Sequence, residues 1–455
     1  MELSVLWSLR LGFSSAEAKK IESAGLKRFL EDSFSSSFDN SLPDFLQDQP
    51  KSIKEWKEFR KKIKESDPET RKRELLREIN KINEVKLWWL EKMVAADYPL
   101  REKMVGFWQN HFVVSSAKVP VNYWLFQYNS LLRENAFGNF RELTKKVVKS
   151  NAMVHYLDNT DNRRGKLNEN LSRELLELFT LGIGNYSEDD IKNGAKGLAG
   201  LTPGDETAVY RPLLADNEPF TYLGKTAAFK SDAMIDQIFE QPQIPYLLTR
   251  KILKWFIYDN PDEKLVTYYG DYFRKSDFEI KPLLVKICTE EFQKPNVAMR
   301  IKDPLTYILQ LYNELEVAKP NLALTGLFLK KQGMDLLNPP SVKGWDGGRS
   351  WLTGQILLQR YQVADLLCLG KNIKGKAIIP NENGGFSRKL TWEKGDNKKV
   401  ISELSGRLLC QTDADSEADF EKLLPYDFNP DDESADSAVL RLFNAMIKTP
   451  EFQII

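Results

Sequence analysis

The stretch Lys166–Gly200, KLNENLSRELLELFTLGIGNYSEDDIKNGAKGLAG, concentrates the residues that decide the fold. Its first half predicts a helix over Leu171–Leu181. An asparagine at its start, Asn168 or Asn170, can accept hydrogen bonds from the free amide groups of the first turn. Gly182 then supplies the left-handed conformation that commonly ends a helix.

The predicted helix has one apolar face and a polar margin. At about 100° per residue, one arc collects its large apolar side chains, namely Leu171, Leu175, Leu176, Leu178 and Phe179. Glu174 falls at the edge of this arc, where burial would raise its carboxyl pKa unless it meets a partner. Ser187 with Asp190 reads as a capping box for a second helix that continues through Leu198.

Helical periodicity continues through most of the chain, so the sequence predicts a mainly α fold. We expect a single multi-helix body over residues 1–455, with at most a small β excursion near 205–225. Residues 99–112 read as an amphipathic helix, which would bring Trp108 and His111 to the buried side.

The chain allows several subdivisions. The body can form two lobes, 1–200 with the organising stretch and 230–455 with a loop rich in glycine, proline and tryptophan. Residues 51–92 predict a charged helical hairpin broken at Asp67-Pro68. Residues 411–437 are acidic and predict an exposed connection.

Composition excludes several classes of function. Lysine plus arginine equals aspartate plus glutamate at 65 each, which gives no global charge for nucleic-acid binding. No run of apolar residues is long enough to cross a membrane, and the N-terminal sequence lacks the pattern of an export signal, which favours a cytoplasmic location. Three widely spaced cysteines indicate neither a disulfide framework nor a metal site.

Several blocks of the sequence resemble a bacterial family, the domain of unknown function 1800 family (DUF 1800). They occur in family order from about Leu6 to Phe452, so the resemblance covers nearly the whole chain. Besides the organising stretch, the blocks are FWQNHF at 107–112, FGNFREL at 137–143, YLDN at 156–159, LNPP at 337–340, Gly344-Trp345, Trp351 and TPEF at 449–452.

The resemblance implies that the chain is a member of this family, but it implies no particular activity, because the family has no assigned reaction. Its members are commonly encoded beside exported, sulfatase-like proteins, and some carry export signals themselves. The family often has a His-Asp pair ahead of the Leu-Gly found here at Leu223-Gly224, but this chain has Ala215-Asp216. A histidine expected before Pro242 is replaced by Gln241. These departures weaken an enzymatic interpretation.

Two histidines limit the chemistry that the chain can perform. A histidine-rich metal site is excluded, and we predict no metal and no cofactor. His155 lies in an apolar context and is expected to be structural. His111 is the candidate base or proton relay, with Glu174 or Glu177 as its carboxylate partner. The alternative is a core histidine that joins two helices.

The polar residues before and within the predicted helix allow the same two interpretations. Glu169, Arg173 and Glu177 are spaced by four residues and can form a self-neutralising ladder. We predict that the two helices pack together and that His111 bonds to Glu174 or Glu177, directly or through Asn168 or Asn170. Such a carboxylate pair would raise the histidine pKa.

The loop Asn338–Trp351 combines two tryptophans with glycines at which backbone can approach closely. Exposed Trp345 and Trp351 would stack on a sugar ring or a partner peptide, whereas buried indoles would pack onto the body. The candidate binding residues are Trp108, Asn168, Glu169, Asn170, Arg173, Trp345 and Trp351.

Two classes of function follow. The favoured one is a non-catalytic interaction or scaffold component of a bacterial complex, whose partner is a protein, such as the sulfatase-like neighbour that the resemblance implies. The alternative is a hydrolase-like or proton-transfer enzyme centred on His111 and Glu174.

Overall fold

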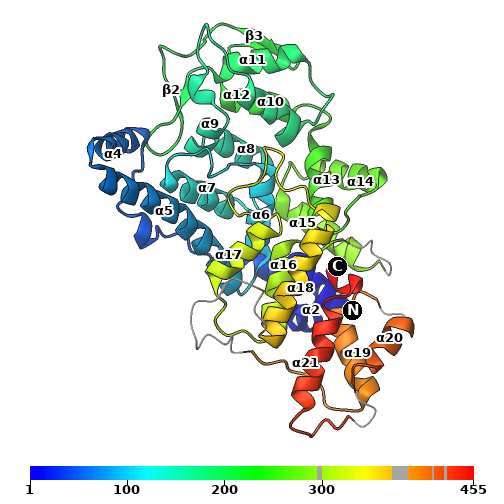
Figure 1. Ribbon diagram of the computed structural model, residues 1–455. Helices are drawn as coiled ribbons and strands as arrows, with labels where there is room; N and C mark the ends of the chain where they lie inside the picture. The colour runs from blue at the N-terminus through cyan, green and yellow to red at the C-terminus, as the bar shows by residue number, and fades with distance from the viewer. Residues whose placement is uncertain (295–299, 371–387, 412–413, 425–427) are drawn as a thin grey trace.

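Nearly all regular structure in the protein is helical, which confirms the predicted class. The computed structural model describes residues 1–294, 300–370, 388–411, 414–424 and 428–455 (Figure 1). The helices of the first half are α1 Leu3–Leu11, α2 Ala18–Ala24, α3 Leu26–Ser35, α4 Ile53–Glu65, α5 Pro68–Ala95, α6 Leu100–His111, α7 Asn122–Glu134, α8 Phe140–Val148, α9 Asn151–Tyr156, α10 Asn170–Glu174 and α11 Glu188–Leu198.

The rest of the fold consists of a π-helix, the helices in the second half of the chain and short 3-10 turns. A π-helix, η3 Leu175–Thr180, follows α10 directly. The later helices are α12 Ser231–Phe239, α13 Ile244–Phe256, α14 Glu263–Lys275, α15 Ile280–Phe292, α16 Pro304–Glu314, α17 Leu322–Lys331, α18 Gly354–Leu369, α19 Asn397–Leu408, α20 Ala414–Glu421 and α21 Ala435–Met446. The 3-10 turns are η1 Asp44–Leu46, η2 Asn159–Asp161, η4 Gly348–Trp351 and η5 Pro450–Gln453.

The β excursion consists of two small antiparallel hairpins. Strand β1 (Leu201–Thr202) pairs with β2 (Val209–Tyr210), and β3 (Phe220–Tyr222) pairs with β4 (Lys225–Ala227). They lie beside α11 and α12 at one end of the molecule, and α19–α21 lie at the other (Figure 1). The small β content near 205–225 is therefore as predicted.

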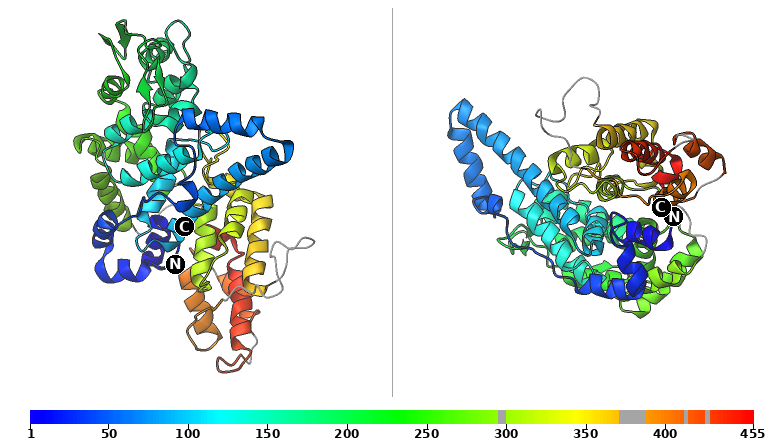
Figure 2. Two further views of the ribbon diagram at one scale, coloured as in Figure 1. Left: turned by 90° about the vertical axis from the view of Figure 1, so that its left-hand side faces the viewer. Right: turned by 90° about the horizontal axis from the view of Figure 1, so that it is seen from below.

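Helices α4 and α5 extend from the body as an antiparallel pair (Figure 2). Asp67 begins α5, since its carboxylate accepts from the amides of Glu69 and Thr70 at 3.0 and 2.9 Å, and Pro68 occupies the first helical position. Within the acidic segment 411–437, residues 414–421 form α20, while 412–413 and 425–427 are outside the described residues.

Helix α6 lies at the centre of the core and is buried on nearly all sides, so it is not the amphipathic helix that the sequence predicts. Its polar side chains are paired inside the protein instead. Glu102 binds the Arg133 guanidinium with both carboxylate oxygens, at 2.6 and 2.9 Å. Lys103 bonds to Asp303 at 3.2 Å and to Thr306 at 2.8 Å. Periodicity cannot reveal such pairing, because the partners are remote in sequence.

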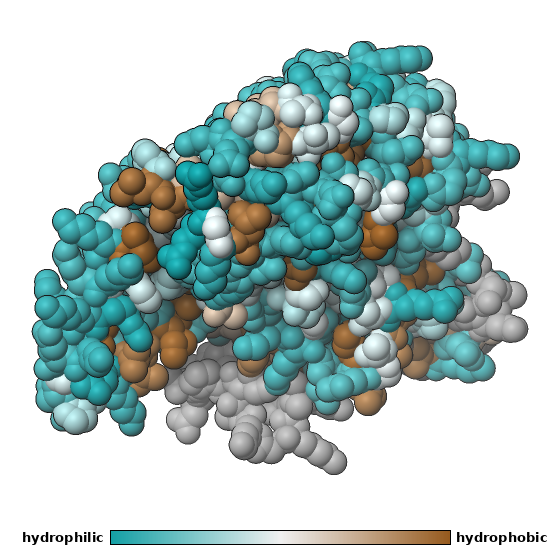
Figure 3. Space-filling model, turned by 90° about the horizontal axis from the view of Figure 1, so that it is seen from above, coloured by the Kyte–Doolittle hydropathy of each residue, from teal (hydrophilic) through white to brown (hydrophobic). Residues whose placement is uncertain are grey.

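The two chain ends meet on one side of the molecule (Figures 1 and 2). Val5 and Leu9 of α1 pack with Ile455, and the Arg300 backbone exchanges hydrogen bonds with that of Ile455. The face seen in Figure 3 is mostly hydrophilic, with apolar side chains scattered over it.

Candidate functional site

A hydrogen bond from the backbone holds residues 343–351, here called the Trp loop, against the end of α6. The Trp345 amide donates to Asn110 Oδ1 at 2.6 Å. Gly344 makes this approach possible, because its φ is +87° and a Cβ there would lie 2.2 Å from Asn110 Oδ1. The sequence indicated close backbone approach at these glycines but did not identify Asn110 as the partner.

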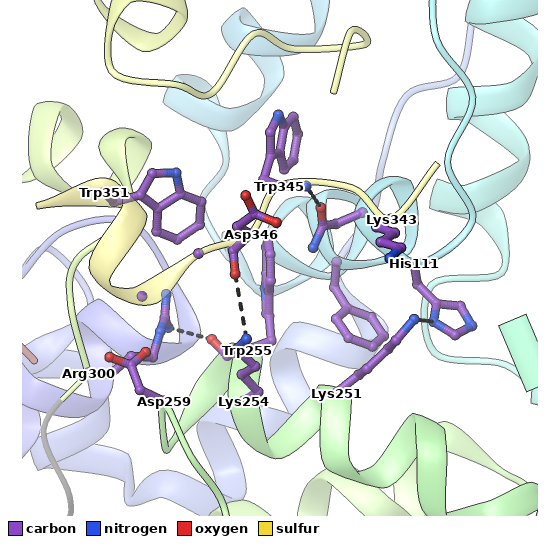
Figure 4. A pocket seen from close by; sticks show the side chains of 14 residues that line it. His111, Lys251, Lys254, Trp255, Asp259, Arg300, Lys343, Trp345, Asp346 and Trp351 are labelled. Carbon is purple, nitrogen blue, oxygen red and sulfur yellow. Dashed lines mark hydrogen bonds between the residues drawn. The ribbon is translucent and has the colours of Figure 1, made fainter. Parts of the chain in front are cut away.

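A pocket of about 230 Å³ lies between α6, α13 and the Trp loop (Figure 4). Its lining residues come from 107–111 and from 251–351, which are far apart in the chain. Its charged lining comprises four cationic side chains and two carboxylates, whereas its aromatic lining comes from α6, α13 and the Trp loop. The lining residues are Phe107, Asn110, His111, Lys251, Lys254, Trp255, Asp259, Arg300, Lys343, Trp345, Asp346, Gly347, Gly348 and Trp351.

Two backbone carbonyls of the π-helix η3 bond to side chains that line this pocket. The amides of Leu181 and Gly182 both reach back to the Leu176 carbonyl, at 3.0 and 3.1 Å. The Leu178 carbonyl accepts from Lys251 Nζ at 2.8 Å, and the Phe179 carbonyl bonds to His111 Nε2 at 3.0 Å. Cationic groups are favoured at such a helix end, where carbonyls lack helical partners.

These contacts determine the state of His111. A carbonyl can only accept, so Nε2 carries the ring proton, and Nδ1 accepts from Lys251 Nζ at 3.2 Å. Burial lowers the pKa of His111 well below 6.5, and the Lys251 charge lowers it further. The predicted packing of the two helices therefore occurs, but the predicted carboxylate partner and raised pKa are wrong.

Lys251 is the main candidate residue of the pocket that the sequence does not reveal. Burial, followed by repulsion from Lys254, lowers the pKa of Lys251 to about 8. Its only sequence signal is a second lysine three residues later on the same helix, and such a pair usually indicates a solvated face. The backbone carbonyl and imidazole that surround it come from segments far away in the chain.

Glu174 and Glu177 are both partly buried but do not bind His111. Burial raises the pKa of Glu174, and repulsion from Glu177 adds to this, as the sequence predicts for a carboxyl without a partner. Glu177 accepts from the Tyr186 hydroxyl at 3.1 Å. Attraction to Arg173, and then to Lys343, opposes this rise in the pKa of Glu174.

The other polar residues of the organising stretch stabilise local structure. Asn168 Oδ1 accepts from the Asn170 amide at 3.0 Å, and Asn170 Nδ2 donates to Asp158 at 3.2 Å. Arg173 pairs with Glu169 at 3.1 Å, as the predicted ladder requires, but its second partner is Glu188 at 3.0 Å rather than Glu177.

The three candidate tryptophans are buried. Trp345 and Trp351 are each 4% exposed and contact the pocket from its walls. This arrangement corresponds to the packed alternative of the sequence prediction. Trp108 is fully buried, and its indole N–H donates to the Ala136 carbonyl at 3.0 Å. A side chain in that position packs the core and offers no surface to a ligand.

A buried ion cluster lies next to Arg300, one of the lining residues. Arg300 and Lys103 each bond to Asp303 Oδ2 at 3.2 Å. Burial alone would raise the pKa of Asp303, but the charges of Lys103 and Arg300 outweigh it and hold that pKa well below its usual range.

Neither a metal site nor a membrane span is found in the described part of the chain. No group of three or more His, Cys, Asp or Glu side chains there is arranged to hold a metal ion. None of the described helices combines the length and the apolar composition needed to cross a bilayer.

The protein is a helical body with a small cationic pocket, in which a histidine is held by a backbone carbonyl and a lysine. The chain belongs to the DUF1800 family of proteins of unknown function, whose profile matches residues 4–454. The resemblance inferred from the sequence is therefore confirmed. No curated protein and no solved structure gives a significant match.

Proposed function

We propose that the protein is a non-catalytic binding component of a larger assembly, and that the pocket beside α6 and α13 is its ligand site. The supporting observation is the state of His111, because both ring nitrogens are already bonded and neither partner is a carboxylate. A neutral imidazole held in this way contributes to structure, whereas the lysines around it provide charge for recognition.

A proton-transfer enzyme is the second candidate, and one observation favours it. Lys251 borders the pocket with a pKa of about 8, so a fraction of its amine is unprotonated near neutral pH. In this alternative Lys251 takes the role that the sequence analysis predicts for Glu174, with His111 as its neighbour. The substitution Lys251→Arg separates the two candidates, because arginine keeps the positive charge but does not release a proton.

Site-specific photo-cross-linking in the native cell tests the binding proposal. A cross-linking amino acid at Arg349, which is exposed on the Trp loop, should capture a defined partner. The same amino acid at exposed Lys225 on β4 is the control, since that position is remote from the pocket. A sulfatase-like protein of the kind encoded beside relatives is a candidate for the captured species.

Each outcome decides between the candidates. A partner captured at Arg349 alone, and still captured in a Lys251→Arg background, supports a binding component. Identical products from both positions, or none from Arg349, would contradict it. Loss of the cellular function in Lys251→Arg with partner capture intact would favour the enzyme.

A further inference from the structure

We propose that the pocket binds a phosphate monoester carried by a small organic group, with the phosphate between Lys251, Lys254 and Lys343. This inference rests on the proposed function, because it names the chemistry of the ligand at the same site. Its basis is the charge, the free donors and the aromatic walls of the pocket.

The pocket has more positive than negative charge. Lys251, Lys254, Lys343 and Arg300 face two carboxylates, Asp259 and Asp346. Among the described residues, none of the three lysines forms an ion pair within 4.0 Å, whereas Arg300 is bonded to buried Asp303. An anion in the pocket would offset the cost of holding the Lys251 ammonium out of water.

Hydrogen-bond donors remain available on each lysine. An ammonium has three N–H groups, and Lys251 uses two of them, on the Leu178 carbonyl and His111 Nδ1. Lys254 makes one long contact of 3.5 Å with the Asp346 carbonyl (Figure 4). The Lys343 ammonium has no hydrogen bond to any described residue, although it lies close enough to Glu174 to attract that carboxylate.

Three lysines with unused N–H donors favour a doubly charged group over a singly charged one. A phosphate monoester carries about −1.5 to −2 at neutral pH, whereas a carboxylate or a sulfate ester carries a single charge. The remaining walls are aromatic, from Phe107, Trp255 and the two Trp-loop indoles. The volume of about 230 Å³ is smaller than that of a typical drug-sized site, so the organic part must be small.

Binding of phenyl phosphate to the full chain tests the proposal by calorimetry, with inorganic phosphate, phenyl sulfate and benzoate as comparisons. The variant K254Q/K343Q removes two exposed lysines of the site, and K225Q/K319Q removes two exposed lysines elsewhere as a matched control. We expect saturable binding to the wild type and the control, and affinity at least about tenfold lower in K254Q/K343Q, since charge-assisted bonds are lost.

Phosphate ions also stabilise most proteins because they are excluded from the protein surface. The difference in affinity between K254Q/K343Q and the other two proteins is therefore the result that reports on the pocket. The proposal would be overturned if all three proteins bound phenyl phosphate with equal affinity. It would also be overturned if benzoate or phenyl sulfate bound more tightly than phenyl phosphate. Inorganic phosphate binding as tightly as phenyl phosphate would overturn the organic part. A partner cross-linked at Arg349 without phosphate affinity would refute this inference alone, and affinity without a partner would refute the proposed function alone.

Discussion

His111 illustrates, at the scale of one residue, how a buried polar group finds partners that sequence does not reveal. Helical spacing correctly places it on a buried face and next to the organising stretch. Its partners are a backbone carbonyl and a lysine, not the nearby carboxylates. Residue type predicts pairing between side chains, but every residue has a backbone carbonyl, so the sequence carries no signal for the Phe179 contact.

The lowered pKa of His111 predicts a pH-dependent stability. The unfolded chain binds a proton near pH 6.5 and the folded chain only well below it, so the unfolded state is favoured as pH falls below about 6.5. Each unit of pKa difference corresponds to about 1.4 kcal/mol. Urea unfolding of the wild type should show stability decreasing from pH 7 to pH 5.

Two variants test whether His111 causes this pH dependence. His111→Gln should be less stable at pH 7 but should lose less stability on acidification. His155→Gln is the control, because the pKa of His155 is also lowered by burial but this ring is only partly buried. A pH dependence unchanged in His111→Gln would show that the imidazole is not held neutral.

Trp345 predicts a loss of stability rather than a selective loss of binding. Its side chain is 4% exposed, so Trp345→Ala should reduce the free energy of unfolding by about 3 to 5 kcal/mol. Chemical denaturation measures this value. A decrease in the free energy of unfolding of less than about 1 kcal/mol would contradict this packing role and favour the alternative of an exposed binding group.

At the scale of elements, the sequence predicts the type and position of a helix better than the register of its backbone hydrogen bonds. Asn168 accepts from the first helical amide, at Asn170, although the N-cap itself is Glu169. The positive φ of Gly182 and the capping box of Ser187 with Asp190 are also present. The register of η3 is different, because residues 175–180 form a π-helix. Apolar periodicity over six residues cannot separate π from α geometry, so the carbonyls that bind Lys251 and His111 could not be located.

The junction of the Trp loop with α6 predicts a specific requirement for glycine. Gly344→Ala combines an unfavourable positive φ with a contact of 2.2 Å to Asn110 Oδ1. Gly333→Ala has a similar φ of +84° but no atom within 4 Å, so it measures the conformational cost alone. We expect Gly344→Ala to be less stable than Gly333→Ala by about 1 to 3 kcal/mol, measured by chemical denaturation. Equal losses would contradict the close approach.

At the scale of the whole molecule, buried ion pairs connect segments that are far apart in sequence. Lys103 on α6 and Asp303 at the start of α16 are separated by 200 residues and almost fully buried. Composition gives equal numbers of opposite charges but not which of them are paired inside. This is why the global charge excluded an extended basic surface, yet did not reveal a cationic pocket.

Removing one member of this pair should destabilise the entire fold. Asp303→Ala leaves the Lys103 and Arg300 charges buried together, and we expect a loss of about 3 to 5 kcal/mol. Asp431→Ala is the matched control, because it breaks the exposed pair with Lys394 and should cost at most about 1 kcal/mol. Thermal and chemical unfolding measure both variants. Equal losses of stability in Asp303→Ala and Asp431→Ala would show that Lys103 and Asp303 contribute no more than a surface pair.

The π-helix η3 gives the protein an unusual sensitivity to chain length within one short segment. A π turn accommodates one residue more than an α turn, so deletion of a single residue between 175 and 180 would allow an ordinary α-helix. The segments on either side would keep their relative orientation, but the carbonyls within the segment would pair with amides four residues later instead of five. The carbonyls that hold His111 and Lys251 would then accept from helical amides, and the surroundings that set the protonation of these two side chains would change although no lining residue had been altered.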